Sequence, residues 1–340
     1  MLANKFYTDP DMMINKTDDK RLVSGPVYDL LLICIPLFVP ISYYVLTIQF
    51  PSYNSLLFFI YLFILGETHF GATWLFFIHP NNRAWVVKNK YYSIYLPIIV
   101  IAALIILAIR SINFVLLIIL IYNFFHVTRQ SIGVTKIYAS RNSNIKIELI
   151  YIYISNFLCV VVGIFRFIIP IDIINDNLFI ISCFVILVSC SYFVLILVMP
   201  WKSKNIYFVA SVLTGIFLYS PLLFANTIQD AFAMGVGMHY SQYLAIVIPV
   251  NLRRLSQIER GDNIKLASNN KRNKFFLMII SYLLLYSGIM VSLTYTKNFL
   301  DYYYLIPVFF QLAHFYLDSF TWRFSDEHIK TNIGKYIFLR

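Results

Sequence analysis

The sequence predicts an all-α, polytopic integral membrane protein, and three observations lead to that prediction. Apolar residues make up 60% of the 340 residues. Charged residues make up only 13%, against roughly 25% in soluble domains. Apolar runs of about 20 residues, long enough to cross about 30 Å of hydrocarbon, recur along the whole chain. A chain of this composition is suited to fold inside a lipid bilayer.

Ten apolar segments meet the length requirement of a membrane-spanning helix. They cover residues 27–48, 55–79, 91–109, 112–136, 148–169, 178–199, 206–225, 228–250, 275–296 and 301–323. The connections between them are too short to hold a second domain. We therefore predict one transmembrane helical domain over residues 27–323, between a polar N-terminal tail of residues 1–26 and a C-terminal tail of residues 324–340.

The basic residues of the connecting loops are sorted between the two sides of the predicted membrane. Loops after odd-numbered segments hold only Arg110 and Lys297. Loops after even-numbered segments hold fourteen: Arg83, Lys88, Lys90, Arg141, Lys146, Lys202, Lys204, Arg253, Arg254, Arg260, Lys265, Lys271, Arg272 and Lys274. Because basic loops stay in the cytoplasm, we predict a multi-pass inner-membrane protein with both termini cytoplasmic. The net charge of +11 then reflects topology, and we expect no nucleic-acid partner.

Four of the six histidines share one predicted depth in the membrane. Each lies on a different even-numbered segment, about 11 to 14 residues from the outer end, and these segments all run in the same direction. The four are His69, His126, His239 and His314. The other two, His79 and His328, lie at predicted cytoplasmic ends. The four should therefore meet within about one helical turn of a common level.

Ionisable groups inside a bilayer are costly, face the bundle interior and tend to be functional. Neutral imidazole is also a common protein ligand for iron, copper and zinc. No cluster of cysteine or methionine accompanies the four histidines, which disfavours copper(I) and iron–sulfur sites. The pattern favours a shared metal or haem site. A metal-free polar core or a proton path is the alternative.

Each histidine has a polar residue within four positions. Glu67 precedes His69, and the other three follow His126, His239 and His314 in turn: Gln130, Gln242 and Asp318. Metal-bound imidazoles usually donate their second N–H to a carboxylate or carbonyl. Glu67 and Asp318 are the best candidates for that supporting role, and the two glutamines join them as candidate catalytic residues. The alternative for each carboxylate is a charge pair with Arg129 or Arg323.

Three short stretches resemble a known family. They are "HFG" at His69, "FFHVTRQ" at His126 and "HFYLDSFTWR" at His314. They resemble boxes of the bacterial Brp/Blh-like β-carotene 15,15'-dioxygenases, polytopic membrane enzymes in which histidines hold a non-haem iron and a carotenoid is cleaved to retinal. The resemblance covers about a tenth of the chain. It implies that these three histidines are iron ligands, with Asp318 in the place of the family's terminal aspartate.

The chain departs from the family pattern at two places. Gln130 stands where the family's HxxxH box has its second histidine. The family's early glycine-rich histidine box has no counterpart, and the nearest stretch, "SGPVYDL", carries Tyr28 and Asp29 instead. His239, in "MGVGMHYSQYL", would have to supply the missing ligand. The resemblance therefore implies an iron site more directly than a carotenoid substrate.

Together these observations predict a membrane oxygenase that uses non-haem Fe²⁺ and dioxygen on a lipophilic, carotenoid- or lipid-like substrate entering from the bilayer. The alternatives are a histidine-ligated haem b protein, a membrane diiron hydroxylase or desaturase, and a proton-coupled transporter. Diiron enzymes of this type need about eight clustered histidines, and no internal repeat or pair of broken helices favours a transporter. No sequence feature identifies an electron donor.

Overall fold

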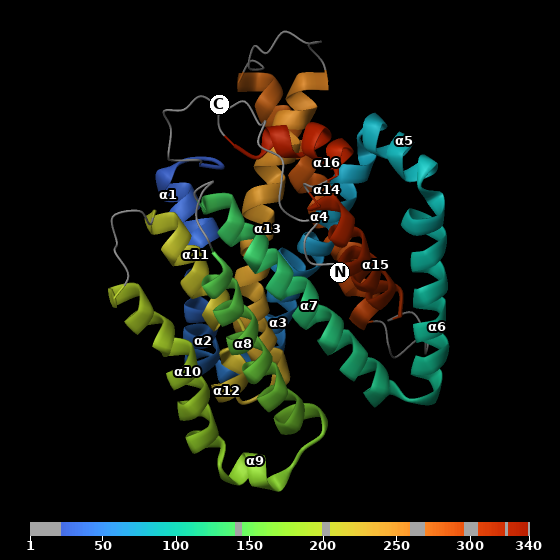
Figure 1. Ribbon diagram of the computed structural model, residues 1–340. Coiled ribbons are helices and arrows are strands. Elements are labelled where there is room, and N and C mark those ends of the chain that lie inside the picture. The colour runs from blue at the N-terminus through green and yellow to red at the C-terminus, as the bar shows by residue number, and fades with distance from the viewer. Residues whose placement is uncertain are drawn as a thin grey trace, which may run out of the picture.

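The computed structural model describes residues 22–139, 145–198, 205–258, 269–295, 305–323 and 326–338, which form a helical bundle without strands (Figure 1). Among these described residues, seven helices are long and apolar enough to cross a membrane, and the number rises to nine if each of two bent helix pairs is one span. The predicted all-α class is confirmed, and the helices have the length and composition of membrane spans.

The seven long spans coincide with seven of the predicted segments. The first combines η3 (Pro51–Tyr53), α3 (Asn54–Tyr61), η4 (Leu62–Gly66) and α4 (Glu67–Ile78). The others are α7 (Ile112–Tyr138), α8 (Lys146–Gly163) with η6 (Ile164–Ile168), α10 (Leu178–Val198), α11 (Ile206–Phe217) with α12 (Pro221–Phe224), α13 (Ile228–Ile258) and α14 (Asn269–Tyr295). Predicted segment 301–323 contains α15 (Leu305–Thr321), whose 17 residues are slightly fewer than the about 20 that cross a bilayer.

One bend breaks predicted segment 27–48, and a second bend joins predicted segment 91–109 to a helix in the loop expected before it. In the first, α1 (Pro26–Tyr28) and η2 (Asp29–Cys34) meet α2 (Phe38–Gln49) at 57°. Pro36 lies in this break, where it has no N–H to continue the helix and keeps the preceding residue out of the helical conformation. In the second, α5 (Pro80–Lys88) meets η5 (Tyr91–Tyr95) and α6 (Leu96–Arg110) at 93°. Ser93 ties this corner together by donating to the carbonyls of Val86 and Asn89.

Helices α13 and α11 form the centre of the bundle, and α10 and α14 lie at its periphery. In the most apolar stretch of α13, 83% of the residues are buried, and in that of α11 with α12 78% are buried, against 17% for α10 and 28% for α14. Gly235 of α13 lets the centre pack tightly, because a Cβ there would lie 2.3 Å from the Leu218 carbonyl oxygen. The apolar faces of α10 and α14 remain for lipid.

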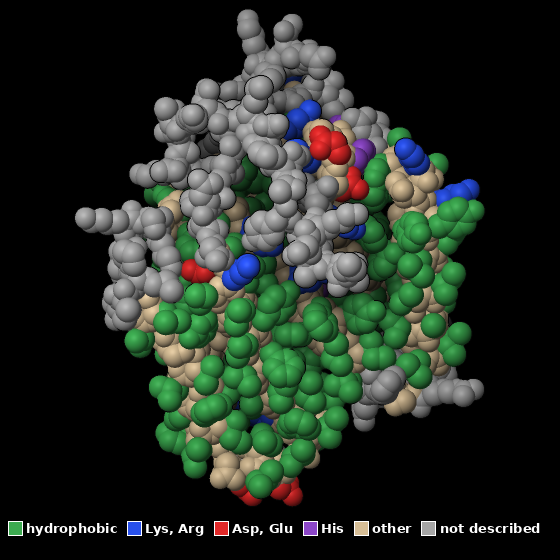
Figure 2. Space-filling view, in the orientation of Figure 1, with side chains coloured by type: hydrophobic (Ala, Val, Ile, Leu, Met, Phe, Trp, Pro, Cys, Tyr) green, Lys and Arg blue, Asp and Glu red, His purple; other side chains and the backbone are tan. Residues whose placement is uncertain are grey.

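The two ends of the bundle differ in charge. Helix α9 (Asp172–Asp176) lies at one end, and α5 and α16 (Glu327–Asn332) lie at the other (Figure 1). Figure 2 shows hydrophobic side chains around the middle of the molecule, with most of its visible Lys and Arg side chains toward the α5 and α16 end. The acidic residues of α9 mark the opposite end. This difference between the two ends matches the excess of basic residues in the loops after the even-numbered segments.

The segment expected to be a C-terminal tail folds back onto the bundle. It forms α16 and η9 (Gly334–Tyr336), which contact α5 and α13. Ile329, Ile333 and Ile337 are buried there. Arg253 of α13 fastens the segment by donating to the carbonyls of Tyr336 and Ile337. Most of residues 324–340 therefore belongs to the packed domain.

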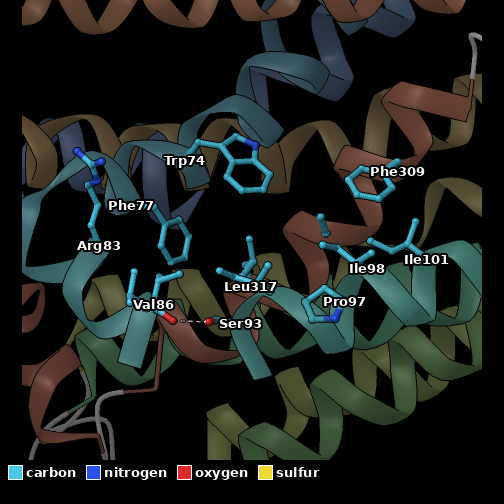
Figure 3. A pocket seen from close by; sticks show the side chains of 13 residues that line it. Trp74, Phe77, Arg83, Val86, Ser93, Pro97, Ile98, Ile101, Phe309 and Leu317 are labelled. Atoms are coloured by element: carbon cyan, nitrogen blue, oxygen red, sulfur yellow. Dashed lines mark hydrogen bonds between the residues drawn. The ribbon is translucent and has the colours of Figure 1, made fainter. Parts of the chain in front are cut away.

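An apolar cavity of about 370 Å³ lies between α4, α5, η5, α6 and α15 (Figure 3). Its walls include Trp74 and Phe77 of α4 and Ala313 and Leu317 of α15. Arg83, the one charged residue in its lining, lies at one end in Figure 3, with Phe309 and Ile101 at the other. The cavity thus borders the same two helices that carry His69 and His314.

Candidate metal centre

The four intramembrane histidines meet in the interior of the bundle. His69 comes from α4, His126 from α7, His239 from α13 and His314 from α15. The centroid of the His69 ring lies 4.5 Å from that of His314, 4.9 Å from that of His239 and 6.3 Å from that of His126. All four side chains are buried. The structure thus brings together the four residues that the sequence places at one depth.

The His69 imidazole has unpaired nitrogens. It is 0% exposed, and neither Nδ1 nor Nε2 has a hydrogen-bond partner. The Nε2 atom of His239 is likewise buried and unpaired. Buried polar groups in native proteins are nearly always paired, so each such exception needs an explanation. Here the unpaired nitrogens lie on neighbouring rings.

A π-helical segment, η4, immediately precedes α4. Such wide turns occur often at functional sites, because they shift the face on which the following residues lie. The turn ends at Gly66, and His69 follows within the first turn of α4. Local backbone geometry therefore helps to set the direction of the His69 ring.

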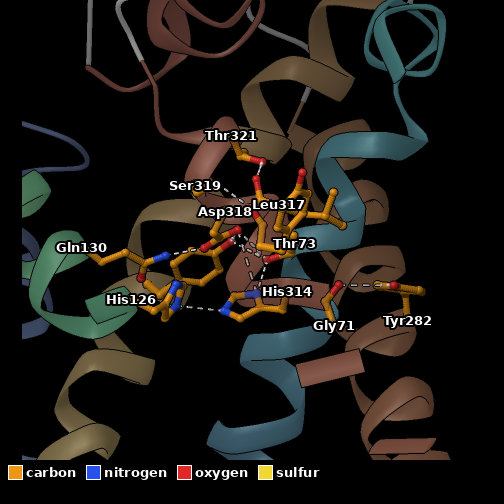
Figure 4. A network of polar contacts seen from close by, with 12 residues as sticks. Gly71, Thr73, His126, Gln130, Tyr282, His314, Leu317, Asp318, Ser319 and Thr321 are labelled. Atoms are coloured by element: carbon orange, nitrogen blue, oxygen red, sulfur yellow. Dashed lines mark hydrogen bonds and ion pairs between the residues drawn. The ribbon is translucent and has the colours of Figure 1, made fainter. Parts of the chain in front are cut away.

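The Nε2 atoms of His126 and His314 lie within hydrogen-bonding distance, 3.1 Å apart (Figure 4). Two nitrogens bound to a metal at about 2.1 Å lie about 3.0 Å apart at a right angle and about 3.4 Å apart at the tetrahedral angle. The observed separation falls between these two values. It fits neighbouring ligands of one ion.

Thr73 connects His314 to Asp318. Its Oγ1 lies 2.5 Å from His314 Nδ1 and donates to Asp318 Oδ1 at 2.9 Å (Figure 4). Because the hydroxyl proton goes to the carboxylate, Thr73 accepts from the Nδ1–H of His314. The Nε2 atom of His314 then carries the lone pair and faces His126. The carboxylate support that the sequence predicts for His314 thus passes through a hydroxyl group.

Asp318 is held by two further donors. Tyr243 donates to its Oδ1 at 3.0 Å, and the Gln130 amide donates to its Oδ2. Asp318 is 3% exposed, whereas Arg129 and Arg323 are exposed. Asp318 is therefore held by uncharged hydrogen-bond donors in place of the alternative charge pairs. Gln130, four residues after His126 on α7, thus contacts Asp318.

Glu67 and Gln242 lie beside other groups. Glu67 accepts from Gln311 Nε2 at 3.2 Å, and Gln242 donates to the Ile33 carbonyl at 2.5 Å. Residues two apart on a helix do not face each other, so Glu67 diverges from His69. Each keeps one buried oxygen without a partner, Oε2 of Glu67 and Oε1 of Gln242. The structure therefore gives Asp318, and not Glu67, a supporting contact to the histidines.

Two overlapping groups of side chains can hold a metal ion. One contains His69, His126 and His239, and the other contains His126, His314 and Asp318. In each group the potential ligand atoms lie within 4.8 Å of one another. Ligand atoms at about 2.1 Å from an ion are at most about 4.2 Å apart, so binding needs only small side-chain shifts. His126 belongs to both groups and joins them into one centre.

Sequence reasoning missed Thr73 and Tyr243. Thr73 follows His69 by four residues, and Tyr243 follows His239 by four, so each shares a helix face with its histidine. That spacing is the signal that could have identified them. The Tyr243 ring centroid lies 4.4 Å from that of His69, so this side chain also closes the wall of the centre.

The remaining two histidines lie apart from the centre. His328 Nε2 is 3.0 Å from Asn82 Oδ1, and its ring stacks on Trp85 with centroids 5.7 Å apart. His79 follows the end of α4 and lines a different cavity.

No family model, curated protein or solved structure matches the chain.

Proposed function

We propose that this chain is a membrane-embedded non-haem iron oxygenase that oxidises or cleaves a lipophilic substrate with dioxygen. The observation that carries the proposal is His69, a fully buried imidazole with neither nitrogen hydrogen-bonded and with three other histidines beside it. A purely structural polar core would pair these nitrogens, because unpaired buried polar groups are costly. A metal ion pairs one nitrogen of each ring directly.

In this proposal the chain crosses the inner membrane ten times, with both termini in the cytoplasm. Its support is the charge difference between the ends of the bundle, since the basic end becomes the cytoplasmic end. The bent pairs and α15 complete the count of ten. The histidine centre then lies within the hydrocarbon layer, where it is shielded from water.

Four histidines hold the iron: His69, His126, His239 and His314. When bound, iron supplies the Lewis-acid and redox chemistry for an oxidation by dioxygen. Thr73 and Asp318 hold the His314 ring in the tautomer that presents Nε2. Gln130 orients Asp318 through its second oxygen. Burial of all four rings excludes bulk water from the centre.

The apolar cavity beside α4 and α15 supports a lipophilic substrate. At about 370 Å³ it lies within the usual range of small-molecule pockets. Trp74 adjoins Thr73 in the chain and Ala313 adjoins His314, so the cavity borders another face of the two helices that carry His69 and His314. The resemblance to the Brp/Blh-like family makes a carotenoid the first substrate to test.

The haem b alternative is disfavoured by the spacing of the rings. Two imidazoles on opposite sides of a haem iron would have their nitrogens about 4 Å apart with a flat macrocycle between them. The 3.1 Å separation of His126 and His314 leaves no room for that plane.

A proton-coupled transporter is the second candidate, and one observation favours it. Hydrogen bonds run without a break from His126 through His314 and Thr73 to Asp318. Such a chain can also pass protons. A proton path needs no metal, so metal content distinguishes the two candidates.

The test uses the full chain purified in mild detergent after expression in iron-supplemented cells. The oxygenase proposal expects iron without a Soret band, and dioxygen uptake when β-carotene in detergent micelles is added. Unchanged β-carotene in an iron-loaded protein would redirect the search to other lipids. Purified protein without metal, even after reconstitution with Fe²⁺, would reject the oxygenase and favour the transporter.

A further inference from the structure

A second polar group, away from the histidines, is buried without a full set of partners. Arg254 lies near the end of α13 and is only 1% exposed. Its Nη1 donates to Asn251 Oδ1 at 3.1 Å, one turn earlier on the same helix. Its Nε and Nη2 are buried and have no hydrogen-bond partner. Asn251 is uncharged, so the buried cation lacks a counter-ion among the described residues.

The unpaired donors occupy one edge of the guanidinium group. Nε–H and the adjacent Nη2–H point in parallel, and this edge binds two oxygens of a carboxylate or phosphate at once. The remaining face is covered by Phe76, whose ring centroid lies 5.5 Å from the guanidinium carbon. Burying a lone cation costs several kcal/mol in general, whereas a bidentate oxyanion offsets much of that cost. The arrangement therefore fits an absent anion.

Arg254 also lines a cavity of about 220 Å³ between α4, α13 and α14. His79 and Asn251 line the same cavity. Three basic side chains lie near His79. They are Arg254, Lys335 and His328. Asp326, at this end of the bundle, is engaged in capping α16. The surroundings of the cavity are thus predominantly cationic.

The other walls of the cavity are apolar and reach the lipid-facing helix α14. They include Leu75, Leu255 and Ile279. Met278 of α14 lines the cavity and is 51% exposed, and its neighbour Leu277 is 64% exposed. A soluble anion would find few polar partners here. A lipid can place its phosphate at Arg254 and lay its chains along the exposed face of α14.

We infer that Arg254 binds the phosphate group of an anionic membrane phospholipid at the basic end of the bundle. The volume of about 220 Å³ accommodates a head group and not a whole lipid, so the acyl chains stay in the bilayer. This site is separate from the histidine centre and does not depend on the oxygenase proposal. Arg254 thus has two roles: it binds a lipid, and it contributes to the positive charge of the basic end of the bundle.

The test measures thermal unfolding of the full chain after extensive delipidation in detergent. Phosphatidylglycerol is added to one sample, diacylglycerol with the same chains to a second, and inorganic phosphate to a third. Only phosphatidylglycerol should raise the melting temperature of the wild-type protein. Equal stabilisation by diacylglycerol or by inorganic phosphate would overturn the inference, because it would show a site for chains alone or for a free anion.

The variants Arg254→Gln and Arg254→Lys identify the residue. Arg254→Gln should lose the shift, and Arg254→Lys should need about tenfold more lipid because an ammonium lacks the two-donor edge. Arg272→Gln, which alters an exposed arginine of α14, should behave as wild type. If Arg254→Gln does not fold, the lipid dependence of the Arg254→Lys melting temperature alone tests the assignment. A wild-type lipid response in either Arg254 variant that folds would refute the assignment, as would an equal loss in Arg272→Gln.

Discussion

The Nε2 atoms of His126 and His314 face each other across 3.1 Å, although 188 residues separate them in the chain. Thr73 and Asp318 leave the lone pair of His314 on this nitrogen. Without an ion, His126 must donate a proton into the gap. With an ion, both lone pairs point to it. Metal binding therefore requires the His126 proton to move from Nε2 to Nδ1, and the affinity for metal should fall at a pH low enough to protonate the imidazoles, because an imidazolium has no lone pair for a metal.

The four central histidines should be necessary for metal binding. Replacing His69, His126, His239 or His314 with alanine should sharply lower the iron content per mole of purified protein and abolish turnover. His79→Ala and His328→Ala are the controls, because neither ring belongs to the centre. If His79→Ala loses as much iron as His69→Ala, a second metal and the diiron alternative must be considered again.

Thr73 should act through His314. Thr73→Val keeps the shape of the side chain but removes the hydroxyl between His314 and Asp318. Loss of such a supporting contact typically weakens metal affinity or activity by about 10–100-fold. Iron titration of the purified variant measures the effect. Thr73→Ser should restore most of the affinity, whereas wild-type affinity in Thr73→Val would mean that Asp318 supports nothing.

A matched control lies one turn earlier on the same run of helix. Thr68 is also buried, but its hydroxyl donates only to backbone carbonyls, those of Ile64 and Leu65. Thr68→Val should therefore leave the iron affinity unchanged. An equal loss in both valine variants would point to a general packing effect.

Filling the apolar cavity should impair substrate binding but not metal binding. In Ala313→Phe, the ring should occupy space between α15 and Trp74, so KM for a lipophilic substrate should rise at least about tenfold with little change in iron content. Steady-state oxygen uptake with the substrate found for the wild type measures this. Ala103→Phe, on an exposed position of α6, is the control. Unchanged KM in Ala313→Phe would place the substrate elsewhere.

The basic end of the bundle should face the cytoplasm. Reporter fusions after Asn270, at the start of α14, and after Arg340 should both report a cytoplasmic location. The physical reason is the excess of Lys and Arg in the loops at that end. An external location for either fusion would overturn the orientation proposed for all ten segments.

The sequence allowed prediction of the long helices and of the four histidines, because both follow from strong and simple signals. Apolar length identifies a span, and a charged or titratable residue inside it is rare enough to stand out. The shared depth of His69 and His314 needed only the direction of each helix. Because they lie at one depth on helices that pack together, the two side chains meet in one centre.

The contacts around the histidines could not be predicted from depth alone. Glu67 seemed equivalent to Asp318 in the sequence, but its position two residues before His69 directs it to Gln311. Thr73 and Tyr243 are ordinary residues for an apolar helix, and only their four-residue spacing from His69 and His239 marks them in the sequence. Direction around the helix axis, which depends on packing and on the wide turn of η4, decides these contacts.

The basic and C-terminal segments show another limit of sequence reasoning. Arg254 was counted as a loop charge, yet it is buried at the end of α13. The segment after residue 323 was expected to be a tail, yet Ile333 and its neighbours pack against the bundle. Composition averages over a segment, whereas burial is decided residue by residue.

The origin of the ligands on α4, α7, α13 and α15 has a consequence for biogenesis. Thr73 and Asp318, which together support His314, are 245 residues apart. During synthesis α4 and α7 enter the bilayer long before α15 leaves the ribosome. A nascent chain therefore lacks one histidine and its carboxylate until the last long helix has been inserted. Under the proposed function, the complete metal centre forms only after α15 has been inserted, and a chain truncated before Leu305 should bind iron weakly.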